Sequence, residues 1–211
     1  MERTTTASLS GRRAEALRND RRILDAARAV FTADPGAPIA AVAARAGVGI
    51  GALYRRYRSK EELLERLCLD GLRRYLAAAE AALADGGDPG ATFARFMRDS
   101  LDAGAGSLTL RFAGQFAATE ELRRAGRAAH EVTQRLLDRA KAAGVLRADI
   151  TVGDISLLFE QLQAIRVGDE RRTAVLRHRY LALLLDALRA PAAPLPGPAP
   201  GWDEISHRYD R

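Results

Sequence analysis

The sequence predicts an all-α fold, with a small N-terminal three-helix head and a larger C-terminal helical bundle. Apolar residues keep helical spacing through long stretches rich in Ala, Leu and Arg, while strand-forming residues are sparse. A glycine-rich turn between two short apolar faces is typical of a helix-turn-helix. Positive charge is also concentrated at one end: residues 1–60 hold 12 Lys and Arg against 5 Asp and Glu, and residues 61–211 hold 21 against 22. This distribution indicates a nucleic-acid-binding domain joined to a near-neutral one, and an anionic membrane surface is the rival partner.

Residues 1–15 are expected to form a flexible basic arm that carries Arg12 and Arg13, because the first ten residues are polar and unpatterned. The arm has no apolar core of a secretion signal, and no uncharged apolar run of about 18 residues follows it. A single cysteine, Cys68, excludes an intramolecular disulfide and suits a reducing compartment. We therefore expect a soluble, cytoplasmic protein.

Residues 16–60 are predicted to be the three-helix head. Its first helix has one apolar face, made by Ile23, Ala27, Val30 and Phe31. Two short helices follow around Gly47, which stands where a helix needs a residue with positive φ. Ala43 is small where these two helices must approach each other, which favours a tight helix-turn-helix.

Residues 61–189 are predicted to be a helical bundle. Its first helix starts beside the head at a capping box, in which Ser59 and Glu62 satisfy each other's amides, and it ends before Pro89. Thr119 and the pair Thr151 and Asp154 resemble further helix caps. The remaining helices are expected at about 90–103, 107–118, 119–143, 152–168 and 170–189. Residues 190–211 form a proline-rich tail, for which polyproline II or disorder without a packed core is the expectation.

The run AAVAARAGVGIGALYRRYRSKEELLERL, residues 40–67, resembles the DNA-binding signature of the tetracycline-repressor (TetR) family of bacterial transcription regulators. The matching positions are Ala46, Gly47, Val48, Gly51, Leu53, Tyr54, Tyr57, Lys60 and Leu63. Beyond residue 90 the resemblance covers only length, helix count and the apolar final pair of helices.

The resemblance implies a ligand-responsive DNA-binding regulator, most often a repressor. Such a protein is an Ω-shaped homodimer whose heads bind the two halves of a palindromic operator on double-stranded DNA. A small hydrophobic or amphipathic effector binds in the C-terminal domain and releases the DNA.

Carried over by position, the resemblance implies that Tyr54 and Arg56 contact phosphates or base edges, and that Lys60 meets a phosphate. Ile50 and Gly51 start the recognition helix, where a thymine methyl and a close backbone approach are expected. Gly49 replaces the hydroxyl residue common in the family. The complete set of expected DNA-binding residues is Arg45, Gly49, Ile50, Gly51, Tyr54, Arg55, Arg56 and Lys60.

Two further sites are expected in the bundle. An aromatic cluster with nearby polar groups is the candidate effector pocket, and plain core packing is the alternative. It consists of Phe93, Phe96, Met97, Phe112, Gln115, Phe116, His130 and Glu160. The run YLALLLDAL, residues 180–188, has eight apolar residues of nine, so its helix must be covered on more than one side. A subunit interface or a central core position would satisfy this, and the expected interface residues are Ile155, Phe159, Leu162, Leu181, Leu184 and Leu188.

The remaining motifs do not indicate catalysis, a cofactor or a metal. The glycines of the run from Gly47 to Gly51 follow a helix and lack the Lys-Ser/Thr of a phosphate loop. His130, His178 and His207 are too widely separated for a metal-ligand pattern, and no nucleophile motif occurs. An enzyme is therefore not expected. The alternative to a DNA-binding regulator is an interaction protein that uses the helix-turn-helix scaffold to bind a protein or an anionic membrane.

Overall fold

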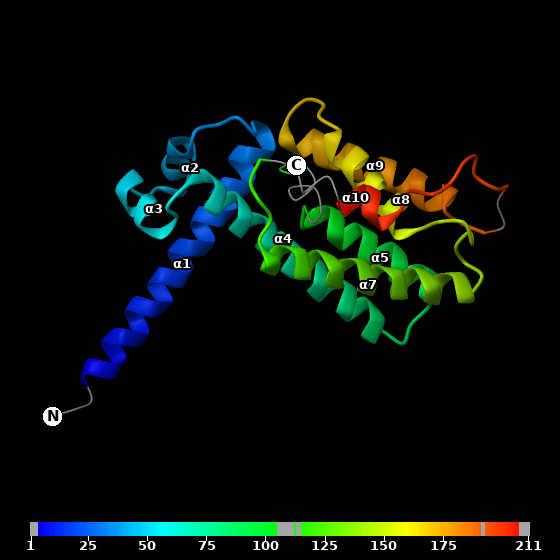
Figure 1. Cartoon of the computed structure of the whole chain (residues 1–211), viewed down its shortest axis with the longest axis horizontal. Helices are drawn as coiled ribbons and strands as arrows, with labels where there is room; N and C mark the ends of the chain where they lie inside the picture. The colour runs from blue at the N-terminus through cyan, green and yellow to red at the C-terminus, as the bar shows by residue number, and fades with distance from the viewer. Residues whose placement is uncertain (1–3, 105–111, 113–114, 191–192, 207–211) are drawn as a thin grey trace. The chain divides into compact units, whose positions relative to one another are not determined.

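The computed structural model of the chain describes residues 4–104, 112, 115–190 and 193–206 (Figure 1). It divides into two compact units, Met1–Leu67 and Cys68–Arg211. The described residues are helical apart from turns, loops and one isolated β-bridge, so the predicted all-α class is confirmed. Among these helices, none combines the length and the apolar character that crossing a membrane requires.

The first unit contains α1 (Thr4–Ala33), α2 (Ile39–Ala46), α3 (Ile50–Arg56) and the start of α4 (Lys60–Ala84). Its core joins the apolar faces of all four helices and includes Ile23, Ala27, Phe31, Val42, Leu53, Leu63 and Leu67. Burial of these side chains is what stabilises helices as short as α2 and α3, which would not persist in isolation.

The expected arm is wrong from Thr4 onward, because the backbone of α1 is already helical there. The stretch contains Ala, Leu, Glu and Arg, all strong helix formers, and no proline that would stop a helix from extending ahead of its buried part. Polarity alone therefore misidentified a helical extension as an arm.

Gly47 ends α2 with φ 65°, as the sequence predicted. Its N–H donates to Ala44 O at 3.2 Å, and the next N–H, of Val48, donates to Ala43 O at 3.1 Å. This pair of bonds is the Schellman arrangement, which requires a left-handed residue between them. The Nη2 of Arg22 adds a bond of 2.8 Å to Ala46 O. The turn between α2 and α3 is therefore stabilised by its own backbone hydrogen bonds and by the Arg22 side chain of α1.

The start of α4 differs from the predicted capping box. The Ser59 hydroxyl accepts from the Glu62 N–H at 3.2 Å, as expected, but the Glu62 carboxylate accepts from the Arg58 N–H at 2.7 Å. One of the two hydrogen bonds of the capping box is thus replaced by a bond from the N–H of Arg58, the residue before Ser59. The carboxylate still lies near the helix N-terminus, where negative charge is favourable.

The second unit contains the rest of α4 and the helices of the bundle, which are α5 (Pro89–Asp102), α7 (Glu120–Ala142), α8 (Val152–Ala164), α9 (Glu170–Ala187) and α10 (Trp202–Ser206). Side chains cap their N-termini: Asp88 for α5, Thr119 for α7, Asp169 for α9, and a complete capping box of Thr151 and Asp154 for α8. The caps expected at Thr119 and Thr151 are confirmed.

Aromatic contacts organise the core of the second unit. The ring of Tyr75 on α4 meets Phe96 of α5 edge to face, with centroids 5.2 Å apart, and Phe159 of α8 in the same manner at 6.5 Å. The core of the bundle thus packs around the ring of Tyr75.

A hydrogen bond also holds the end of α7. There the Nζ of Lys141 donates to Ile150 O at 2.5 Å and ties the helix to the loop before α8.

Two sequence expectations for this unit need correction. The predicted helix at 107–118 falls mainly outside the described residues, and those described, Phe112 and 115–118, lie in turns and irregular backbone. The proline-rich tail was expected to have no packed structure. Instead it forms the short helix α10, drawn red in Figure 1, which packs against α8 and buries Ile205.

Candidate DNA-binding surface and internal cavity

The helix-turn-helix presents an exposed basic and aromatic surface. Ile50 and Tyr54 of α3 are 44% and 47% exposed, although both are large apolar side chains. Arg45, at the end of α2, and Arg55, on α3, are also exposed, and among the described residues neither makes a hydrogen bond or ion pair. Gly49 and Gly51 are exposed between them. These charges and side chains are available to a partner, which favours a surface for binding an anionic molecule.

Arg56 is placed differently from its neighbours. Its Nε donates to Asp20 Oδ1 at 2.8 Å, and the Tyr57 hydroxyl donates to the same oxygen at 2.5 Å. Hydrogen bonding to Asp20 raises the pKa of Arg56, and burial raises that of Tyr57 above its ordinary range, with the Asp20 bond adding to the effect. Arg56 therefore fixes the end of α3 to α1 while its side chain stays half exposed.

Lys60 makes several contacts within the first unit. Its Nζ donates to Pro35 O at 3.1 Å and to Ala37 O at 2.9 Å, and lies 5.1 Å from the centroid of the Phe31 ring. These contacts close the loop between α1 and α2. Any phosphate contact of Lys60 would have to use its remaining N–H donor.

A cavity of about 270 Å³ lies within the second unit. Helices α4, α7, α8 and α10 contribute its walls, which are mainly apolar. The lining residues used below are Tyr75, Arg123, Arg127, His130, Thr133, Val152, Trp202, Ile205 and Ser206. Its size is near the lower limit of small-molecule sites in proteins.

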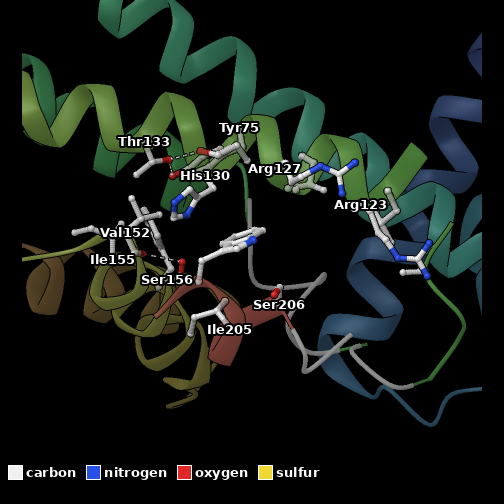
Figure 2. A pocket seen from close by; sticks show the side chains of 17 residues that line it. Tyr75, Arg123, Arg127, His130, Thr133, Val152, Ile155, Ser156, Ile205 and Ser206 are labelled. Atoms are coloured by element: carbon white, nitrogen blue, oxygen red, sulfur yellow. Dashed lines mark hydrogen bonds between the residues drawn. The ribbon is translucent and has the colours of Figure 1, made fainter. Parts of the chain in front are cut away.

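The polar groups of the cavity come mostly from α4 and α7. Thr133 donates to Ala129 O at 2.7 Å, so the Tyr75 hydroxyl, 2.6 Å away, is the donor to Thr133 (Figure 2). Burial raises the pKa of Tyr75 to about 12. The ring of His130 packs against Trp202 at an interplanar angle of 52°, with centroids 4.5 Å apart, and its buried Nδ1 has no hydrogen-bond partner among the described residues. Burial lowers the pKa of His130, so its ring is neutral at pH 7 and can donate or accept one bond.

Two arginines lie apart from these groups. Figure 2 shows Arg123 and Arg127 on the far side of the cavity from Thr133 and Val152. Arg127 is paired with Glu120 at 2.8 Å. The arrangement combines apolar walls with a neutral polar group at one side and cations at another, which suits an amphipathic ligand.

Of the predicted pocket residues, only His130 lines this cavity. Phe93, Phe96 and Met97 are buried in the core, where Phe96 packs behind the Tyr75 ring. Phe112 is buried, Gln115 exposed, and Phe116 and Glu160 half-buried, all outside the lining. The aromatic spacing of α5 thus reflects core packing, the alternative reading of that pattern.

The predicted interface residues also face inward. Ile155, Phe159, Leu162, Leu181 and Leu188 are each no more than 5% exposed within the single chain, and only Leu184 is half-buried. The apolar residues of α9 that point outward are Val175, Tyr180 and Leu183, each at least half exposed. The run from Tyr180 to Leu188 has two apolar faces, and the sequence did not show which of them the bundle covers.

Sequence reasoning missed several residues that shape both sites. Asp20 and Arg22 were not recognised as supports of the helix-turn-helix, since they lie far from it in sequence. Trp202 and Ile205 had a readable signal: the only tryptophan of the chain and a nearby isoleucine directly follow the proline-rich run of the tail. Such residues indicate a segment that docks.

Comparison with known families agrees with this geometry. Residues 23–67 match the model of bacterial regulatory proteins of the tetR family, and residues 88–190 match the C-terminal domain model described as transcriptional regulator SbtR-like. No curated protein matched.

Solved structures give the same result. A TetR regulator from Mycobacterium vanbaalenii is 29% identical, with a TM-score of 0.56 over 84% of this chain and 99% of that one. The TetR regulator SCO0520 from Streptomyces coelicolor is 26% identical, with a TM-score of 0.59 over 82% and 99%. LfrR from Mycobacterium smegmatis, solved with proflavine, shares the fold at 24% identity and a TM-score of 0.58 over 85% and 99%. Members of this family are transcriptional regulators and not enzymes. The two matched models cover the head and most of the bundle, and the chain belongs to the TetR family.

Proposed function

We propose that this regulator is a repressor that binds a palindromic operator as a homodimer and is released by a small hydrophobic or amphipathic effector. The observation that carries the proposal is the surface of α2 and α3, where Arg45, Ile50, Tyr54 and Arg55 are exposed on a turn fixed from α1. A preorganised surface with unpaired arginines and an aromatic side chain suits the phosphates and base edges of a major groove.

Residue roles within this surface follow from the partners of each side chain. Arg45 and Arg55 are the main phosphate or base contacts, because no described partner competes for them. Ile50 and Tyr54 contact the DNA with their side chains. The backbone at Gly49 and Gly51, which carries no side chain, lets the DNA approach closely. Arg56 and Lys60 act first as structural ties and contact DNA with their remaining donors.

Dimerisation is assigned to the outward face of α9. Val175, Tyr180 and Leu183 are large apolar side chains exposed on this helix, and exposed apolar surface on a soluble protein marks association sites. Leu183→Glu should give monomers in size-exclusion chromatography and abolish binding to a two-half-site operator. A dimer that survives this substitution would reject α9 as the interface.

The effector site is assigned to the cavity of the second unit. Its apolar walls, the unpaired Nδ1 of His130 and the nearby Arg123 and Arg127 support an amphipathic small molecule. Effectors are tested as compounds that release the protein from its operator.

The decisive experiment is to incubate the purified protein with fragments of its source genome, including DNA beside its own gene, and to sequence what is retained. We expect one palindrome whose half-site centres are about 34–36 Å apart or a multiple of that. Retention of all fragments or of none by a folded dimer would favour the alternative of a protein or membrane partner.

Substitutions then test the residue roles on the retained palindrome. Tyr54→Ala, Arg45→Ala and Arg55→Ala should each weaken binding without loss of helicity, and a lost phosphate contact should lower the log–log salt slope by about one. Arg124→Ala is the matched control, because that exposed arginine lies on α7 in the second unit. Equal affinity of all four variants would refute the assignment.

A further inference from the structure

The C-terminal tail folds back onto the second unit through backbone anchors. Arg147 donates to Ala193 O, and the N–H of Leu195 donates to Asp149 Oδ2 at 2.9 Å. Arg147 and Asp149 are themselves paired at 2.6 Å. The start of the tail is therefore fixed beside the loop that precedes α8.

The next contact is an unusually close approach between the tail and α8. Gly153, in the first turn of α8, is buried, and a Cβ built on it would lie 2.3 Å from Pro200 O. That distance is far below any real contact, so the tail can take this path only because residue 153 is glycine. Gly153 does not line the cavity.

Beyond Pro200 the tail becomes part of the cavity wall. Trp202, Ile205 and Ser206 all line it, and the indole of Trp202 packs against His130 in a tilted arrangement, with 4.5 Å between centroids. In Figure 2, Ile205 and Ser206 lie across the cavity from Tyr75 and Thr133. An aromatic group already occupies the place beside the neutral, unpaired imidazole.

Beyond its anchors at Ala193 and Leu195, the tail is held weakly for a segment that closes a cavity. Helix α10 has five residues, too few to be stable alone, and residues 193–199 are exposed. Ile205 is the one fully buried side chain among 193–206. Segments with so few buried contacts open at low free-energy cost.

We propose that residues 193–206 are a lid on the cavity, and that a planar aromatic ligand binds by displacing Trp202 from His130. The inference rests on the proposed effector cavity and names the ligand class for it. A closed lid lowers the apparent affinity for such a ligand in proportion to the fraction of molecules that are open.

Gly153→Ala is the sharpest test, because the added methyl pushes against the Pro200 carbonyl while alanine suits a helix. Gly71→Ala is the matched control: Gly71 is also buried in a helix, α4, but a Cβ there meets nothing within 4 Å. Trp202→Ala removes the occupant itself, and Leu195→Ala truncates an exposed tail residue outside the cavity. Circular dichroism checks that each variant is folded.

Two readouts on the free protein, without DNA, separate this test from that of operator binding. Trp202 is the only tryptophan, so its fluorescence reports the lid directly. In Gly153→Ala its acrylamide quenching should rise about twofold and its emission should shift to longer wavelength, whereas Gly71→Ala should match the wild type. The dye 1-anilinonaphthalene-8-sulfonate should bind about threefold to tenfold more tightly to Gly153→Ala and Trp202→Ala than to Gly71→Ala and Leu195→Ala.

Unchanged quenching in Gly153→Ala would show that the tail does not cover the cavity as a lid. Raised quenching with unchanged dye affinity would show that the lid does not control access. Either result overturns the proposal, and neither depends on whether the protein binds an operator.

Discussion

The two units place their polar side chains in opposite ways. In the first unit, Arg22 donates to the last carbonyl of α2, Lys60 to loop carbonyls and Arg56 to Asp20, while Arg45 and Arg55 are left to solvent. In the second, an imidazole nitrogen without a described partner lies beside an apolar cavity. A surface for a stiff polyanion needs a fixed shape with outward charges, whereas a cavity for a small molecule needs a few unpaired groups within apolar walls.

The largest expected effect breaks the fixed shape of the first unit. Leu53 is fully buried between α3 and the rest of that core, so Leu53→Ala should lower the free energy of unfolding by about 2–5 kcal/mol. Urea unfolding should be followed by circular dichroism, which reports all helices, and by hydrogen exchange of the α7 amides, which reports the second unit. We expect an earlier transition in the first signal and an unchanged midpoint in the second. Equal shifts in both would show that the two units unfold as one.

A smaller effect is expected from the buried hydroxyl pair of the second unit. Thr133→Val leaves the Tyr75 hydroxyl buried without its acceptor and should cost about 1–3 kcal/mol, while Tyr75→Phe removes only the donor and should cost about 1 kcal/mol. Urea midpoints read from hydrogen exchange of the α7 amides measure both. If Tyr75→Phe proved the more costly, the Thr133 hydroxyl would not be the acceptor in this pair.

The smallest expected change in stability concerns the turn between α2 and α3 in the first unit. Gly49 is the N-cap of α3 with extended backbone and no side-chain cap, and a Cβ there meets nothing within 4 Å. Gly49→Ser should therefore stabilise the protein by a few tenths of a kcal/mol. Gly47→Ser is the paired control, since φ 65° penalises a side chain by about 1 kcal/mol or more. Thermal melts by circular dichroism should move the two variants in opposite directions.

Most of the first unit could be predicted from its sequence because its structure depends on local signals. The apolar face of α1, the left-handed Gly47 and the spacing from Ala46 to Leu63 each lie within a few helical turns. The partners of Arg56 and Lys60 could not be predicted, because Asp20 and Pro35 are more than 20 residues away and pairing depends on tertiary packing.

The second unit was predictable in its helices but not in its cavity. The caps at Thr119 and Thr151 gave correct starts for α7 and α8. The aromatic residues of α5 pointed to a pocket, but the choice between lining and core is made by the neighbouring Tyr75 ring, which spacing along α5 does not reveal. The wall made by Trp202 was missed because proline content was read as absence of packing.

Lys60 and Lys141 are the only two lysines among 33 basic residues, and both donate to backbone carbonyls of loops. An ammonium is a compact charge with rotatable donors, whereas a guanidinium is a planar fork that matches a carboxylate or phosphate. At Lys60, two carbonyl oxygens and the Phe31 ring surround one ammonium group, and a planar guanidinium does not fit this arrangement. We expect Lys60→Arg to keep the net charge and yet to loosen the loop between α1 and α2, so equal charge is a poor guide to which substitutions this position accepts.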